Sequence, residues 1–183
     1  MDSVLPPVAK IYLTWHCLSC HSTQGKESML KKLITFIIFI SGTVSASDCF
    51  DMAGRDYQID PDLLRAVAIT ESSGRSNAMN IVSSERYAVG MMQIHSNNFP
   101  HLSEFGITPG KLYADSCLNI YTGAYYLAIA FKRWGYNWRS VGAYNAGFKE
   151  TKRQDLRRKA YSRKVWRNYR TIKANNSQSQ KQR

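Results

Sequence analysis

Residues 29–46 (MLKKLITFIIFISGTVSA) have the layout of a secretory signal peptide. Two lysines precede a stretch in which seven of eight side chains are apolar, and small residues stand at the −3 and −1 positions of a cleavage site after Ala46. An uncleaved anchor helix is the alternative, but this stretch is shorter than the roughly 20 residues needed to cross a bilayer. We expect Met29 to be the true start and residues 1–28 to be an upstream extension, so that residues 47–183 fold after export.

Most apolar residues of the exported part recur at the three- to four-residue spacing of a helix. Hydrophobic residues make up 44% of the whole chain, which is enough for a packed core and excludes a wholly disordered protein. The spacing and the residues that start and stop helices predict helices at 49–57, 61–72, 116–134 and 138–144, and a short segment that begins at Thr108-Pro109. Residues 87–94 fit a short strand or a helix entered at Gly90 equally well. We therefore predict a mainly α domain over residues 47–174.

The four cysteines form two pairs that the predicted cleavage separates. Cys49 and Cys117 stay in the exported chain, and an even number of cysteines in an oxidising compartment predicts one disulfide, with two buried free thiols as the alternative. Residues 17–21 form the CxxCH pattern of c-type haem attachment, but they precede the export signal. His95 and His101 have no Cys or carboxylate at ligand spacing. We expect no haem, no metal and no other cofactor.

The excess positive charge of the exported part lies entirely in its C-terminal segment. Residues 149–183 hold 13 Lys and Arg against 2 Asp and Glu, whereas residues 47–148 hold 8 against 9. An apolar residue recurs every three or four positions in this part, at Tyr161, Val165, Tyr169 and Ile172. This pattern predicts a basic amphipathic helix, followed by a polar, disordered tail at residues 175–183.

Three functions fit the basic helix. Its apolar residues pack on the domain while the Lys and Arg side chains face water, or its charge attracts an anionic wall polymer or a membrane surface, or it binds nucleic acid. Export and the lack of a recognisable nucleic-acid motif argue against the last function. We expect no nucleic-acid partner, and membrane contact only through the signal peptide before its cleavage.

Glu71 is the residue that most suggests chemistry. It follows the apolar residues 66–69 at the end of a helical stripe, where burial raises the pKa of a carboxyl group and lets it serve as a general acid near neutral pH. A surface glutamate at a helix end is the alternative on position alone. Two further segments, GMMQI at residues 90–94 and AYNAG at residues 143–147, would by themselves be a core segment and a helix stop.

These three segments together resemble, in order and spacing, the soluble lytic transglycosylase (SLT) family. The resemblance covers about residues 49–172 and implies a lysozyme-like fold that is mainly α. The positions of Cys49 and Cys117 are similar to those in the small transglycosylases that accompany secretion systems and pilus assembly.

The resemblance implies that Glu71 is the single catalytic glutamate. It would protonate the bridging oxygen between N-acetylmuramic acid (MurNAc) and N-acetylglucosamine (GlcNAc), and then take the proton of the MurNAc C6 hydroxyl as that group attacks C1. A 1,6-anhydro end results without water. The substrate-binding residues implied by the family motifs are Ser84, Met92, Gln93, Tyr144 and Asn145.

The function implied is that of a periplasmic peptidoglycan lytic transglycosylase that opens local gaps in the wall for a secretion, conjugation or pilus machine. Ala88 stands where many secretion-associated members have an Asp that could be a second carboxylate, which favours the route with one glutamate. A lysozyme-type hydrolase remains an alternative, with Glu85, Glu104 or Asp115 as its second carboxylate. A non-catalytic wall-binding scaffold is the other alternative.

Overall fold

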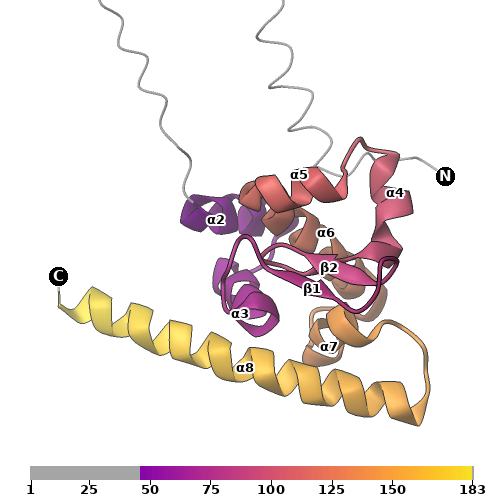
Figure 1. The fold of residues 1–183 in the computed structure, drawn as a ribbon. Helices are drawn as coiled ribbons and strands as arrows, with labels where there is room; N and C mark the ends of the chain where they lie inside the picture. The colour runs from indigo at the N-terminus through magenta and orange to yellow at the C-terminus, as the bar shows by residue number, and fades with distance from the viewer. Residues whose placement is uncertain (1–45, 183) are drawn as a thin grey trace, which may run out of the picture.

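Helices make up most of residues 46–182, the part of the chain that this computed structural model describes (Figure 1). The prediction of a mainly α fold is confirmed. The predicted extension (residues 1–28) and signal peptide (29–46) lie outside the described residues, apart from Ala46. None of the described helices is long and apolar enough to span a membrane. In chain order they are α2 (Ala46–Tyr57), α3 (Pro61–Ser72), the 3-10 helix η2 (Ser96–Asn98), α4 (Phe99–Ser103), α5 (Pro109–Ala114), α6 (Ser116–Trp134), α7 (Trp138–Ala146) and α8 (Lys152–Lys181).

The core is built around α6. Side chains along this helix, such as Ile120 and Leu127, are 0% exposed. The carboxylate of Asp115 begins the helix by accepting a hydrogen bond of 2.9 Å from a backbone N–H of the first turn. A disulfide between Cys49 and Cys117, whose Cα atoms are 5.4 Å apart, joins that turn to α2. The predicted disulfide is therefore confirmed.

A small antiparallel sheet follows α3, with strands in the order β1 (Met79–Ile81), β2 (Tyr87–Val89) and β3 (Ile94–His95). Between β2 and β3 the chain makes a tight turn in which Gly90 has a φ of 78° and Gln93 a φ of 49°. Two left-handed residues within four positions cannot belong to a right-handed helix. The strand is thus the correct alternative for residues 87–94.

The turn at residues 90–93 rests on one buried side chain of α6. Asn119 accepts a hydrogen bond from the backbone N–H of Met92 at 2.7 Å and donates one to the carbonyl of Val89 at 3.0 Å. A Cβ atom at Gly90 would overlap the Asn119 amide, so this position needs glycine for space as well as for its positive φ. The conformation of the turn is therefore set from the core.

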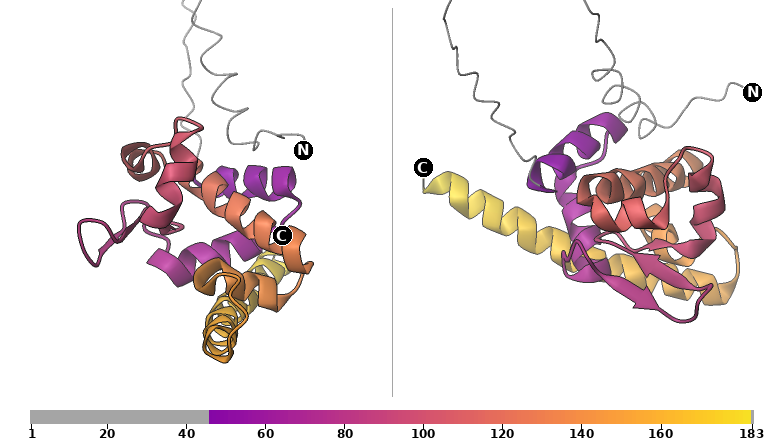
Figure 2. Two further views of the ribbon diagram at one scale, coloured as in Figure 1. Left: turned by 90° about the vertical axis from the view of Figure 1, so that its right-hand side faces the viewer. Right: turned by 45° about the horizontal axis from the view of Figure 1, so that its top comes forward.

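The long helix α8 lies along α3 and α7, and Figures 1 and 2 show its last turns extending beyond them. Tyr161 and Val165 are buried, and Tyr169 and Ile172 pack against the core. The predicted basic amphipathic helix is confirmed, because its apolar side chains cover the domain.

The prediction of disorder for residues 175–183 is wrong for most of that segment, because α8 continues to Lys181. Asn176 donates a hydrogen bond of 3.1 Å to Asp62 of α3, and the hydroxyl of Ser177 donates one to the carbonyl of Lys173 at 2.9 Å. The polar side chains of this segment offer few core contacts. Extending an existing helix is nevertheless easier than starting a new one, because each added residue gains one backbone hydrogen bond. The earlier turns of α8 therefore serve as the nucleus for the polar ones.

Reduction of the disulfide should destabilise the domain strongly. The bond closes a loop with a sequence separation of 68 residues, and the loop-entropy relation gives a loss of about 4 kcal/mol in the free energy of unfolding. Urea denaturation with and without a thiol reductant measures this difference. A Cys49→Ser/Cys117→Ser variant serves as the control and should no longer respond to the reductant. Equal stability of the oxidised and reduced protein would contradict the prediction.

Candidate active site

Glu71 lies half-buried in the last turn of α3, in a pocket of about 270 Å³ between α3, α7 and α8. The helix ends directly after it, where Ser73 and Gly74 take left-handed φ values of 57° and 76°. The carboxylate is therefore held by a rigid helix at a point where the chain turns away. The residues that line the pocket are Thr70, Glu71, Asn145, Arg157, Ala160, Tyr161 and Lys164.

Tyr161 of α8 donates a hydrogen bond of 2.6 Å from its hydroxyl to Glu71 Oε1. Burial raises the pKa of Glu71 above its ordinary value, while this hydrogen bond and the charge of Lys164 offset part of the rise. Burial and the neighbouring carboxylate also raise the pKa of Tyr161 well above its ordinary value, so that its hydroxyl keeps its proton. The pair is suited to hold a proton at Glu71 and to stabilise the carboxylate after that proton leaves.

A second tyrosine, Tyr144 of α7, lies beside this pair. Its ring stacks near that of Tyr161, with centroids 6.4 Å apart, and its hydroxyl donates a hydrogen bond of 2.8 Å to the backbone carbonyl of Met92. Burial, and next the charge of Glu71, raise the pKa of Tyr144 well above its ordinary value. Tyr144 thus connects the helix that carries Asn145 to the turn at residues 90–93.

The same turn is tied to the end of α3. The hydroxyl of Ser72, next to Glu71, donates a hydrogen bond of 2.8 Å to the carbonyl of Met91. Gln93 folds back onto the turn, and its amide nitrogen donates to the carbonyls of Gly90 at 2.8 Å and Ala78 at 3.2 Å. Both amide hydrogens of Gln93 are therefore used within the protein, and its amide oxygen is the atom left to accept a hydrogen bond from a substrate.

The structure brings together only part of the predicted site. Asn145 lines the Glu71 pocket, and the ring of Tyr144 stacks near that of Tyr161. The side chain of Met92 is 0% exposed and lies against Gly123 of α6, so the expectation that it binds substrate is corrected. In this tight turn the side chain of residue 92 points into the core, and only its backbone carbonyl faces Tyr144.

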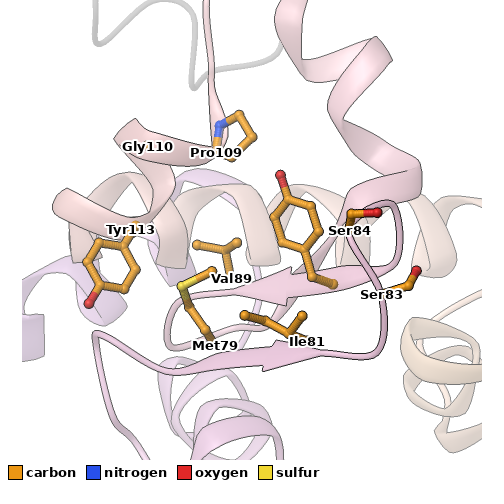
Figure 3. Close-up of a pocket in the computed structure, with 9 residues that line it drawn as sticks. Met79, Ile81, Ser83, Ser84, Val89, Pro109, Gly110 and Tyr113 are labelled. Atoms are coloured by element: carbon orange, nitrogen blue, oxygen red, sulfur yellow. The ribbon is translucent and has the colours of Figure 1, made fainter.

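Ser84, another of the implied substrate-binding residues, does not line the Glu71 pocket. It sits with Ser83 at the turn between β1 and β2, and it lines a separate hollow between this hairpin and α5, together with Met79, Val89 and Tyr113 (Figure 3). The hairpin carries Ser84 towards its outer end and out of the Glu71 pocket, so its expected contact with substrate stays a prediction that this pocket does not support.

Glu71 is the only acidic residue among those that line its pocket. The three alternatives for a second carboxylate are engaged or placed elsewhere. Asp115 caps α6, Glu104 faces His101 at 3.8 Å, and Glu85 is exposed at the turn of the β1–β2 hairpin. Among the described residues, no group of three or more His, Cys, Asp or Glu side chains is arranged to hold a metal ion.

The sequence did not indicate Tyr161 as a site residue. It predicted this tyrosine only as one apolar position of the basic helix, and it gave no role to Arg157 or Lys164. A tyrosine at a core-facing position of a helix is usually just packing, and its hydrogen bond to Glu71 depends on how two helices distant in sequence lie together. The one available signal was a residue type with a polar end at a position otherwise occupied by apolar side chains.

Comparison with known proteins gives consistent results. The family model described as the transglycosylase SLT domain matches residues 48–167. The X polypeptide of Escherichia coli is 56% identical over 138 residues, which cover 75% of this chain and 82% of the relative. Invasion protein IagB of Salmonella typhimurium (strain SL1344) is 35% identical over 150 residues, or 82% of this chain and 92% of the relative.

A solved structure supports the fold. The lytic transglycosylase Slt of Pseudomonas aeruginosa, in an inactive mutant form, superposes with a TM-score of 0.56 at 21% identity. The match covers 72% of this chain and 24% of that larger chain. The predicted lysozyme-like fold is therefore confirmed.

The hydrogen bond from Tyr161 can be tested through the titration of Glu71. Tyr161→Phe removes a donor that stabilises the ionised carboxylate, so the pKa of Glu71 should move further upward. Carbon-13 NMR of glutamate-labelled protein over a pH series measures this directly. Tyr113→Phe, a change at an exposed tyrosine in the separate hollow, should leave the titration as it is. An unchanged or lowered pKa in Tyr161→Phe would mean that the hydrogen bond does not act on the carboxylate.

Proposed function

The chain belongs to the transglycosylase SLT domain family and is a peptidoglycan lytic transglycosylase, and we propose that it cleaves the β-1,4 bond between MurNAc and GlcNAc with Glu71 as its one acid and base. The observation that carries this proposal is the pocket in which Glu71 is the only acidic lining residue and receives a hydrogen bond of 2.6 Å from Tyr161. Glycosidases of the ordinary type need a pair of carboxylates.

The reaction uses the carboxyl group twice. Protonated Glu71 gives its proton to the bridging oxygen as the bond to MurNAc C1 breaks, and GlcNAc leaves with a free hydroxyl. The resulting carboxylate, stabilised by Tyr161 and Lys164, then takes the proton of the MurNAc C6 hydroxyl while O6 bonds to C1. The proton of Glu71 is thereby restored, no water is consumed, and the product carries a 1,6-anhydro ring.

Tyr144, Asn145 and Gln93 are the proposed substrate contacts. Asn145 is exposed in the pocket and offers both a donor and an acceptor to a sugar. Tyr144 forms the wall beside Tyr161, and Gln93 offers its amide oxygen. These roles are consistent with a pocket that orients a sugar ring while Glu71 acts on it.

The proposed place of action is the periplasm, after removal of the signal peptide behind Ala46. The disulfide between Cys49 and Cys117 supports an oxidising compartment. Among the relatives, one is named invasion protein IagB, and Protein IpgF of Shigella flexneri is 29% identical over 150 residues, or 82% of this chain and 97% of the relative. We propose from this similarity that the enzyme opens the wall locally for a secretion, conjugation or pilus machine.

Glu71→Gln should abolish cleavage and keep glycan binding, because the amide has the shape of the carboxyl group but cannot transfer its proton. A loss on the order of 10³-fold in rate is expected for a general acid and base. Release of soluble fragments from purified peptidoglycan measures cleavage, and co-sedimentation with it measures binding. Glu85→Gln, at an exposed turn, is the matched control and should cleave as the wild type does. Undiminished cleavage by Glu71→Gln would refute the assignment.

The products distinguish the proposed reaction from hydrolysis. Mass spectrometry of fragments released by the purified exported protein should show muropeptides about 18 Da (one water) lighter than those from a lysozyme digest. Reducing ends would instead identify a hydrolase. Binding without any products would favour the scaffold alternative.

A further inference from the structure

A stripe of cationic side chains on α8 begins at the Glu71 pocket and continues beyond it. Arg157 and Lys164 line the pocket itself. A neighbouring hollow of about 490 Å³ is lined by Ala160, Arg163, Lys164, Trp166 and Arg167. Because Ala160 and Lys164 belong to both, the two hollows form one continuous surface over α8 (hereafter the cationic stripe: Arg157, Arg163, Lys164 and Arg167).

Some basic residues of α3 and α8 are paired with aspartates, unlike the four cations of the stripe. Arg65, Arg158 and Lys173 form ion pairs of 2.6–3.1 Å with aspartates. Within residues 46–182, no side chain of the stripe makes a hydrogen bond or an ion pair. Glu71 is the only acidic residue that lines either hollow. Apart from the effect of Lys164 on Glu71, the stripe therefore carries positive charge that the described part of the protein does not neutralise.

The shape and composition of the stripe favour a soluble anionic ligand over a lipid surface. A helix that lies in a membrane interface needs an apolar face beside its charges. Most apolar side chains of α8, such as Tyr161 and Val165, face the core instead, and its exposed large apolar side chains, Leu156 and Trp166, are fewer than the cations of the stripe. The charges also surround hollows that start at the reacting carboxylate, which is where a bound substrate would lie.

We propose that the cationic stripe binds the carboxylates of the stem peptides of peptidoglycan, so that the enzyme prefers peptide-bearing strands to bare glycan. This inference rests on the proposed function, because it takes MurNAc to be the sugar at Glu71. The stem peptide is attached to the lactyl group of that sugar, so it leaves the strand close to the pocket. Its free carboxylates are anionic at neutral pH, and Arg and Lys side chains bind carboxylates through charge-assisted hydrogen bonds.

The test measures binding in a Glu71→Gln background, so that it does not depend on cleavage. The probes are soluble glycan strands that keep their stem peptides and the same strands after an amidase has removed the peptides and the lactyl carboxylates left on MurNAc have been converted to neutral amides. Arg163→Gln/Arg167→Gln changes the stripe outside the Glu71 pocket. Its matched control is Lys152→Gln/Arg153→Gln, which removes the same charge from exposed residues at the start of α8.

The stripe variant should lose about ten-fold in affinity for peptide-bearing strands at low salt (about 1.4 kcal/mol), since two exposed charge contacts are removed. Its affinity for bare strands should not change, and the control should match the parent on both probes. An equal loss on both probes, or no loss, overturns the proposal. So does a loss confined to vesicles of anionic phospholipid, because it would assign the stripe to a membrane surface.

Failure of the proposed function gives a different result. Wild-type protein that prefers peptide-bearing strands but releases no fragments would refute the proposed activity and leave the stripe as a peptide-binding surface. Wild-type protein that cleaves both kinds of strand equally well, with a stripe variant that binds like its parent, would keep the activity and refute the stripe.

Discussion

The hydrogen bond from Tyr161 to Glu71 depends on the way α8 lies along α3. The two residues are 90 positions apart in sequence, and nothing local brings them together. At the other end of α3, Tyr169 donates a hydrogen bond of 2.7 Å to Asp60, and Lys173 forms an ion pair of 2.9 Å with the same carboxylate. Because α8 holds α3 at both ends, Glu71 cannot shift along the helix axis without breaking several polar contacts. The orientation of the reacting group is thus a property of the helix pair.

The contacts at Asp60 also make this helix pair sensitive to acid. Burial alone would raise the pKa of Asp60, but hydrogen bonds from Tyr169 and Lys173 outweigh it and hold the pKa below its ordinary value. A carboxylate whose pKa is lower in the folded than in the unfolded chain adds stability above its unfolded pKa, and this stability is lost as the pH falls through the folded pKa. Acid therefore protonates Glu71 and also weakens the helix contact that positions it.

Local signals in the sequence were sufficient for helices such as α3 and α5, because caps such as Asp60 and Thr108 act on the backbone next to them, whereas η2 and α4 were not predicted. The even number of cysteines in the exported part was sufficient for the disulfide. The site was only partly predictable. Met92 lies in a tight turn in which side chains one position apart point in different directions. The motif does not show which of these directions Met92 takes. The position of Ser84 depends on the length of a hairpin, and the role of Tyr161 depends on the contact between α3 and α8.

A single carboxyl group can serve as acid and base only if neither of its states is too stable. Burial at the end of α3 favours the protonated form of Glu71, whereas Tyr161 and Lys164 favour the carboxylate. These effects therefore act in opposite directions on the pKa of the same carboxyl group. A second carboxylate on the sheet would add a further charge and allow a water-dependent route. The position at which the family resemblance suggested a second carboxylate lies at the centre of β2 and is occupied by Ala88. This residue pairs with Asn80 of β1 and His95 of β3 and is 8% exposed. The sheet therefore offers no acidic group there, which is consistent with the proposed route in which Glu71 acts alone.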